Sequence, residues 1–188
     1  MSFRLSLTLL VSTLCLAGCD RGAEDNAQQQ GELPDAKQGL SGEIDRSFAG
    51  ELMPAVEVVD PTGQRLNLAA LQGTPVLLNL WATWCAPCVV EMPMLDALAD
   101  EFGDGLRVVT VSQDLRGQDK VPPFFAEKKF RNLEPWLDPE NTLGFKFEGA
   151  LPVTVLYDAQ GREVFRVLGG YEWDSEEARV AIAEALKN

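Results

Sequence analysis

The chain has 188 residues, enough for one domain of ordinary size with a leader or a tail. Hydrophobic residues make up 46% of it, which is typical of a globular protein with a substantial core. It carries 16 Lys and Arg against 29 Asp and Glu, a formal net charge of −13. This composition argues against the basic face that nucleic-acid binding requires, so no nucleic-acid partner is expected.

Residues 1–18 have the features of a secretory signal peptide. The apolar run 5–16 follows Arg4 and is shorter than the ~20 residues that a membrane-spanning helix needs. It ends in Leu16-Ala-Gly-Cys19, which resembles the lipobox of bacterial lipoprotein signals, so Cys19 is the expected site of lipidation. An ordinary secretory signal with an incidental cysteine is the alternative.

A lipid anchor on Cys19 predicts a location at a membrane outside the cytoplasm, in the periplasm or on the cell exterior. Asp20 resembles the residue that retains some lipoproteins in the inner membrane, which favours that membrane. Residues 19–48 are rich in Gln, Gly, Asp and Glu and lack hydrophobic periodicity, so they are predicted to be a flexible linker. The folded domain is expected over residues 49–188.

Strand and helix patterns alternate along this domain. Strands are expected over 56–59, 65–68, 75–80, 106–112, 136–137, 153–157 and 163–168, and helices over 87–102, 122–130, from 138 onward, and 174–187. Asp138 and Asp174 are the expected caps of the last two helices. The run 75–80 is almost wholly apolar, as in a strand buried on both faces. The pattern predicts an α/β fold in which helices flank a central mixed sheet.

The cysteines of the folded domain form a single close pair. Cys15 lies in the predicted signal peptide and Cys19 is assigned to the lipid, which leaves Cys85 and Cys88. The pair opens a helix, where free amides and the helix dipole stabilise a thiolate. Zinc would need two more ligands, and the chain has no histidine. These features favour a redox-active pair, with no metal and no cofactor besides the Cys85–Cys88 disulfide.

The segment 81–88, Trp-Ala-Thr-Trp-Cys-Ala-Pro-Cys, is followed by Glu91 and Pro93 and later by Leu151-Pro152. Together these motifs are similar to the TlpA/ResA-like branch of thioredoxins, over the region from Glu51 to the C-terminus. The segment 169–173, Gly-Gly-Tyr-Glu-Trp, is most similar to TlpA-type members. The resemblance implies a thioredoxin fold with TlpA-like N-terminal strands and the activity of a thiol–disulfide oxidoreductase.

Position in the helix indicates a role for each cysteine. Cys85, at the helix start, is the expected nucleophile that forms a mixed disulfide with the substrate. Cys88, one turn further on, is the expected resolving thiol. Ala86 and Pro87, between them, are expected to set the geometry and the redox potential of the pair.

Three further residues are expected to contact the substrate. The resemblance implies that Pro152 is a cis-proline facing the active site and that Leu151 offers backbone hydrogen bonds. Trp84 is expected to shield the disulfide, whereas Trp81 is expected to pack in the core.

Two residues set this branch apart from ordinary thioredoxin. Asn79 stands where thioredoxins carry a buried Asp beneath the cysteines, so the usual acid–base group is missing. Glu91, one turn after Cys88, resembles the acidic residue that this branch places near the pair. A carboxylate there would raise the thiol pKa values and could carry the proton of Cys88. A solvated helix charge is the alternative for Glu91.

The resemblance implies a protein-disulfide reductase that receives electrons from a membrane thiol–disulfide transporter. Its substrates would be cysteine pairs of apocytochrome c, or copper-site proteins of cytochrome oxidase biogenesis. A disulfide oxidase or isomerase of secreted proteins remains an alternative, since the motif is compatible with a wide range of potentials.

Two other classes of function are also considered. A thiol peroxidase would explain Thr83, two residues before Cys85, but peroxiredoxins use a lone peroxidatic cysteine and a distant resolving one. A binding module would use the pair as a static disulfide or as a Cu(I) site.

Overall fold

The computed structural model describes residues 39–187. The expected signal peptide 1–18, the expected lipidation site Cys19 and most of the predicted linker lie outside the described residues. Among the described residues, no helix has the length and apolar character that crossing a bilayer requires.

The described chain alternates strands and helices, as the sequence predicts. The strands are β1 (Ile44–Asp45), β2 (Glu57–Val59), β3 (Arg65–Asn67), β4 (Val76–Trp81), β5 (Arg107–Ser112), β6 (Trp136–Leu137), β7 (Val153–Tyr157) and β8 (Glu163–Leu168). The helices are α1 (Ala86–Phe102), α2 (Gly117–Lys128), α3 (Thr142–Lys146) and α4 (Glu176–Ala185), with short 3₁₀ turns η2 (Leu68–Ala70) and η3 (Gly103–Gly105). The predicted α/β thioredoxin fold with a central mixed sheet is confirmed.

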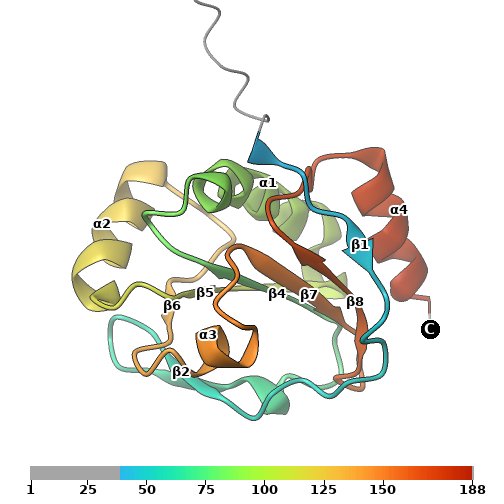
Figure 1. The fold of residues 1–188 in the computed structure, drawn as a ribbon, viewed down its shortest axis with the longest axis horizontal. Coiled ribbons are helices and arrows are strands. Elements are labelled where there is room, and N and C mark those ends of the chain that lie inside the picture. The colour runs from blue at the N-terminus through green and yellow to red at the C-terminus, as the bar shows by residue number, and fades with distance from the viewer. Residues whose placement is uncertain (1–38, 188) are drawn as a thin grey trace, which may run out of the picture. The chain divides into compact units, whose positions relative to one another are not determined.

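One sheet holds all eight strands in the order β1-β8-β7-β4-β5-β6-β2-β3 (Figure 1). The inner strand β4 pairs in parallel with β5 and antiparallel with β7. Every residue of β4 is buried, which explains its apolar sequence. Because side chains alternate along a strand, Leu77, Asn79 and Trp81 share one face, whereas Leu78 and Leu80 share the other.

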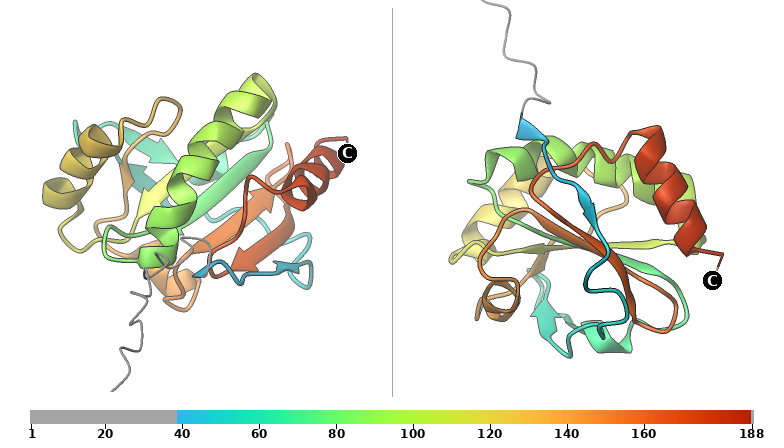
Figure 2. Two further views of the ribbon diagram at one scale, coloured as in Figure 1. Left: turned by 90° about the horizontal axis from the view of Figure 1, so that it is seen from above. Right: turned by 45° about the vertical axis from the view of Figure 1, so that its right-hand side comes forward.

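A hydrophobic core lies on each face of the sheet. On one face, Leu77 and Trp81 pack with buried residues of α1, α2 and α4, including Leu95, Val121 and Ile182. On the other face, buried residues of β4 and β5 pack with η2, α3 and β2, including Leu68, Leu143 and Val58. Figure 2 shows α1 and α4 on one side of the central strands of the sheet, and α3 and the outer strand β2 on the other. Helix α1 is thereby held directly over β4.

The sheet begins earlier in the chain than the sequence predicts. Ile44 of β1 pairs with Val167 of β8, within the stretch 19–48 that was predicted to be linker. Phe48 then stacks under Arg166, whose guanidinium carbon lies 3.6 Å from the ring centroid. The linker prediction is therefore wrong for its last residues. A two-residue strand is too short to show alternation, and its partner lies more than a hundred residues away in the sequence.

Helix α2 also begins earlier than predicted, at Gly117 instead of at Pro122. Proline normally disfavours a helix interior because it lacks an N–H and crowds the preceding turn. Here Val121 is fully buried and Phe124 stacks on Trp81, with 5.0 Å between ring centroids. This packing explains why the helix continues through two prolines.

The predicted caps of α3 and α4 are displaced. Helix α3 begins at Thr142, yet the Asp138 carboxylate accepts hydrogen bonds from the amides of Thr142 (3.1 Å) and Leu143 (2.7 Å). Asp138 therefore caps the first amides of α3 although it lies before the helix in the sequence. Helix α4 is capped by Ser175, whose Oγ accepts from the amide of Ala178, and not by Asp174.

Candidate active site

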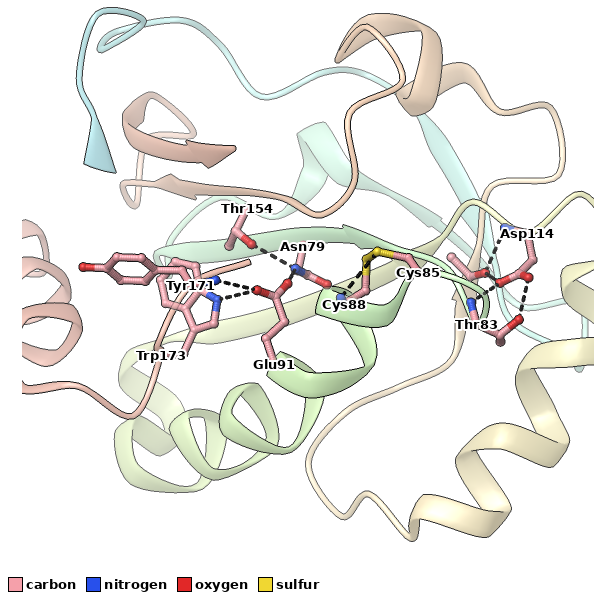
Figure 3. Close-up of a disulfide and its surroundings, with 10 residues drawn as sticks. Asn79, Thr83, Cys85, Cys88, Glu91, Asp114, Thr154, Tyr171 and Trp173 are labelled. Carbon is pink, nitrogen blue, oxygen red and sulfur yellow. Dashed lines mark hydrogen bonds between the residues drawn. A yellow bond between two sulfur atoms is a disulfide. The ribbon is translucent and has the colours of Figure 1, made fainter. Parts of the chain in front are cut away.

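The cysteine pair lies where β4 passes into α1. Cys85 is the N-cap residue of α1, and Cys88 is in its first turn. The two sulfurs form a disulfide, with 5.3 Å between the Cα atoms (Figure 3). Cys85 is 6% exposed to solvent, whereas Cys88 is fully buried. A partner can therefore reach Cys85 but not Cys88.

The start of α1 favours a negative charge on the sulfur of Cys85. The amide of Cys88 donates to the Cys85 sulfur at 3.4 Å. The positive end of the helix dipole lies at the same place. Pro87 is the second residue of the helix, where its missing N–H costs no hydrogen bond. These features lower the free energy of a thiolate on Cys85.

Glu91 is fully buried one helical turn after Cys88, so its alternative as a solvated charge is wrong. Its carboxyl accepts hydrogen bonds from Asn79 Nδ2 at 2.7 Å, and from the Tyr171 amide and Trp173 Nε1 at 3.2 Å each. Burial nevertheless raises the pKa of Glu91 from 4.5 to about 7, since these hydrogen bonds offset only part of the lost hydration. The carboxyl can therefore gain or lose a proton near neutral pH.

Asn79 joins Glu91 to the central sheet. Its amide nitrogen donates to both Glu91 and Thr154 Oγ1, the latter at 2.9 Å. Asn79 and Thr154 are register partners on β4 and β7, so their side chains lie together on one face. The amide oxygen of Asn79 is buried without a hydrogen-bond partner. In Figure 3 the side-chain amide of Asn79 lies between Glu91 and Cys88.

A second polar cluster fixes the loop on the other side of the disulfide. Asp114, after β5, accepts from the Thr83 amide at 2.8 Å and from Thr83 Oγ1 at 2.7 Å. Ser112 Oγ also donates to Asp114, at 2.9 Å. Asp114 is buried, so these hydrogen bonds replace its lost hydration. The sequence analysis missed this cluster, because nothing local marks Asp114 as a partner of Thr83.

The expected substrate-contacting residues are placed around the pair. The peptide bond between Leu151 and Pro152 is cis, as the resemblance implied. Within the described residues, the N–H and C=O of Leu151 have no backbone partner. Trp81 is buried, as predicted. Trp84 precedes Cys85 and is 70% exposed, and its shielding of the disulfide stays a prediction.

Residues 39–42, here termed the N-terminal strap, pass beside Pro87. The Gly42 amide donates to the carbonyl of Gly170 at 2.8 Å. A Cβ at Gly170 would lie 2.6 Å from Leu40 Cδ2 and 3.0 Å from Pro87 Cβ. A Cβ at Gly42 would lie 2.9 Å from the backbone oxygen of Gly169, so glycine at this position lets the strap approach the chain closely. The strap occupies the flank of the active site next to Gly170.

Residues 49–182 match the AhpC/TSA family. The chain belongs to this family. ResA of Bacillus cereus strain ATCC 10987, a thiol–disulfide oxidoreductase, is 31% identical over 153 residues, covering 80% of this chain and 83% of that protein. The thiol:disulfide interchange protein HelX of Rhodobacter capsulatus is 33% identical over 128 residues, covering 65% and 69% respectively.

Two solved structures are similar to the fold. A Chlorobium tepidum protein assigned as thiol:disulfide interchange protein DsbE has a TM-score of 0.65 at 25% identity, covering 73% of this chain and 97% of that one. The exposed lipoprotein thioredoxin Etrx1 of Streptococcus pneumoniae has a TM-score of 0.55 at 28% identity, covering 70% and 97%. With the Cys85–Cys88 disulfide, these relatives identify a thiol–disulfide oxidoreductase of ResA type.

Membership of the AhpC/TSA family does not favour the peroxidase alternative. A peroxidatic mechanism of the kind considered above needs a lone cysteine with a distant partner, whereas Cys85 is bonded to a cysteine three positions away. Thr83 Oγ1 donates to Asp114. Thr83 therefore has a structural role in bracing the loop.

We expect Glu91 to make stability depend on pH. Its pKa is raised on folding, so the folded chain binds more protons than the unfolded chain between pH 4.5 and about 7. The free energy of unfolding should therefore fall as pH rises through this interval, by about 3 kcal/mol. Urea denaturation of the oxidised protein at several pH values measures this slope.

The Glu91→Gln variant should lose the slope, and the exposed Glu140→Gln variant should keep it. An unchanged slope in Glu91→Gln would show that another group titrates.

Proposed function

We propose that this chain is a reductase of cysteine pairs in other proteins, acting outside the cytoplasm at a membrane. The observation that carries this proposal is the buried Glu91 carboxyl, one helical turn from Cys88. The Cys85–Cys88 pair is proposed as its only redox group.

The position of Glu91 favours electron donation over electron withdrawal. Strong oxidants such as DsbA owe their high potential to a stabilised reduced form. An ionised carboxylate near Cys88 instead raises the free energy of a thiolate there by repulsion. The chain also has no histidine that could offset this charge. This repulsion opposes the stabilisation of a Cys85 thiolate by the start of α1 and favours the disulfide over the ionised reduced pair, so the reduced protein is the better electron donor.

The order of the reaction steps follows from the accessibility of Cys85 and the burial of Cys88. The Cys85 thiolate attacks one sulfur of the substrate disulfide, which breaks, and the released substrate thiolate takes up a proton. Cys88 then loses its proton, for which Glu91 is the proposed acceptor, and attacks the sulfur of Cys85. This step closes the Cys85–Cys88 disulfide and releases the second substrate thiolate, which is protonated in turn. Two electrons thus pass to the substrate, which takes up two protons, one equivalent to that of Cys88 and one from water.

The proposed substrate contacts use the groups left open around Cys85. The free backbone of Leu151 can pair with an extended substrate segment, as one strand pairs with another. Pro152 is buried next to Leu151 and is proposed to hold its backbone in place, whereas the exposed ring of Trp84 and the half-buried Pro87, on the face that the strap leaves open, are proposed to supply apolar contact. The proposed substrates are apocytochrome c or copper-site proteins of cytochrome oxidase biogenesis, and the proposed electron donor is a membrane thiol–disulfide transporter.

The roles of the cysteines can be separated by trapping. The reduced Cys88→Ser variant should accumulate a stable mixed disulfide with a disulfide-containing peptide, because no thiol remains to resolve it. The Cys85→Ser variant should form little, since Cys88 is buried. Non-reducing gels and mass spectrometry measure both. Equal trapping by the two variants would contradict the assignment of Cys85 as nucleophile.

The reduction potential distinguishes a reductase from an oxidase or isomerase. We expect the full chain, equilibrated in dithiothreitol and glutathione buffers and read by Trp fluorescence, to have a potential near the thioredoxin value of about −270 mV. A potential more positive than about −200 mV, in the direction of protein disulfide isomerase and DsbA, would contradict the reductase. The Glu91→Gln variant should have a more positive reduction potential than the wild type.

The membrane location rests on the lipobox-like segment before Cys19 and on the likeness to Etrx1, whose structure is described as an exposed lipoprotein. We expect the full chain, expressed in a bacterium, to sediment with membranes and the Cys19→Ser variant to be released from them. Cys15→Ser, within the signal peptide, is the matched control and should stay membrane-bound. Retention of Cys19→Ser would contradict the lipid anchor.

A further inference from the structure

The three most exposed large apolar side chains of residues 39–187 are Leu115 (87%), Phe145 (78%) and Trp84 (70%). Trp84 directly precedes Cys85, Leu115 lies in the loop between β5 and α2, and Phe145 lies in α3. We term these three residues the apolar rim. Exposed apolar side chains are common singly, but a group of them at one place indicates a contact surface.

Strand directions place the apolar rim at the active edge of the sheet. Trp84 follows β4 and Leu115 follows β5, and these strands are parallel, so both loops leave from the same edge. Phe145 lies in α3, whose following loop leads to Pro152 at the start of β7. Because β7 runs antiparallel to β4, its start lies at that edge too.

Buried hydrogen bonds hold the segments of the apolar rim in fixed positions. Asp114 ties the loop of Leu115 to that of Trp84 through Thr83. Gln113 Oε1, on the same loop, accepts from the amide of Gly144 at 3.1 Å, next to Phe145. The rim is therefore preorganised, which reduces the entropy lost when a partner binds.

The opposite flank of the disulfide is already occupied. The N-terminal strap packs on Gly170 and Pro87 there. In the strand order, β8 before Gly170 and β5 before Leu115 lie on opposite sides of β4. A partner segment that reaches Cys85 is thus directed away from the strap and toward the rim.

We propose that the apolar rim selects substrates in which apolar residues flank the reactive cysteine within an extended segment. This inference rests on the proposed function and names the partner class of the same site. Cys85 is only 6% exposed, so a substrate sulfur can bond to it only if the neighbouring residues of the substrate approach the surrounding surface. Apolar neighbours gain free energy by covering Leu115 and Phe145.

The test uses the reduced full chain and two disulfide-containing peptides of equal length and charge. One peptide has Leu and Phe beside its cysteines, and the other has Ser and Gln. We expect the second-order rate constant for reduction to be about tenfold higher for the apolar peptide, a difference of ~1.4 kcal/mol. In the double variant Leu115→Gln/Phe145→Gln this ratio should fall to near one.

Leu52→Gln is the matched control, because Leu52 is 63% exposed and pairs with Arg162 at the opposite edge of the sheet. It should keep the tenfold ratio. A ratio near one in the wild type, a ratio unchanged in the double variant, or an equal loss in Leu52→Gln would each overturn the proposal.

Docking can also be measured without redox chemistry. The same peptides with both cysteines replaced by serine should change the Trp fluorescence of the oxidised chain, and the apolar peptide should bind about tenfold more tightly. If reduction fails but this preference is found, the reductase proposal is wrong and the rim proposal stands. If the two serine peptides bind with equal affinity, the rim proposal is wrong.

Other occupants of the rim give different results. A dimer that dissociates in the double variant, with an unchanged peptide ratio, would assign the rim to a second copy of the chain. If the wild type and Leu52→Gln bind neutral lipid vesicles and the double variant does not, while the peptide rate ratio is unchanged, the rim would be assigned to a membrane surface. Either result would overturn substrate selection.

Discussion

The hydrogen bond from Asn79 to Glu91 joins the central strand of the sheet to the helix that carries both cysteines. The same amide reaches β7 through Thr154, and the same carboxyl reaches the segment before α4 through Trp173. Strand, helix and segment converge on one buried carboxyl. In a low-dielectric interior these hydrogen bonds are strong and fix the relative positions of the groups they join, although the Asn79 amide oxygen has no partner. The position of Cys88 over the sheet depends on it.

The network also connects stability with chemistry. Burial raises the pKa of Glu91 to about 7, so the group is poorly suited to stabilising the fold at high pH and well suited to proton transfer at neutral pH. Ordinary salt-bridged carboxylates behave in the opposite way, with lowered pKa values. Asp114, on the other side of the disulfide, holds a loop by accepting hydrogen bonds. Two buried acids near one disulfide thus differ in function because their surroundings differ.

The sequence predicts the inner strands and the cysteine site well, because both depend on local signals. The apolar run of β4 and the motif around Cys85 are examples. Prediction from the sequence fails where a strand, helix or side chain depends on a partner that is distant in the chain. Strand β1 has no pattern of its own, α2 continues through Pro122 because of packing on Trp81, and the partnership of Asn79 with Thr154 requires the strand register. The position of Glu91 is predictable from helical spacing, whereas its three donors come from distant segments.

The N-terminal strap has a consequence for how the domain would be presented to its surroundings. The described chain starts beside Pro87, so whatever precedes Gly39 leaves the domain at its redox-active edge. The proposed lipid tether would join the domain next to its disulfide. Encounter with a partner in the same bilayer then becomes a two-dimensional search at high effective concentration.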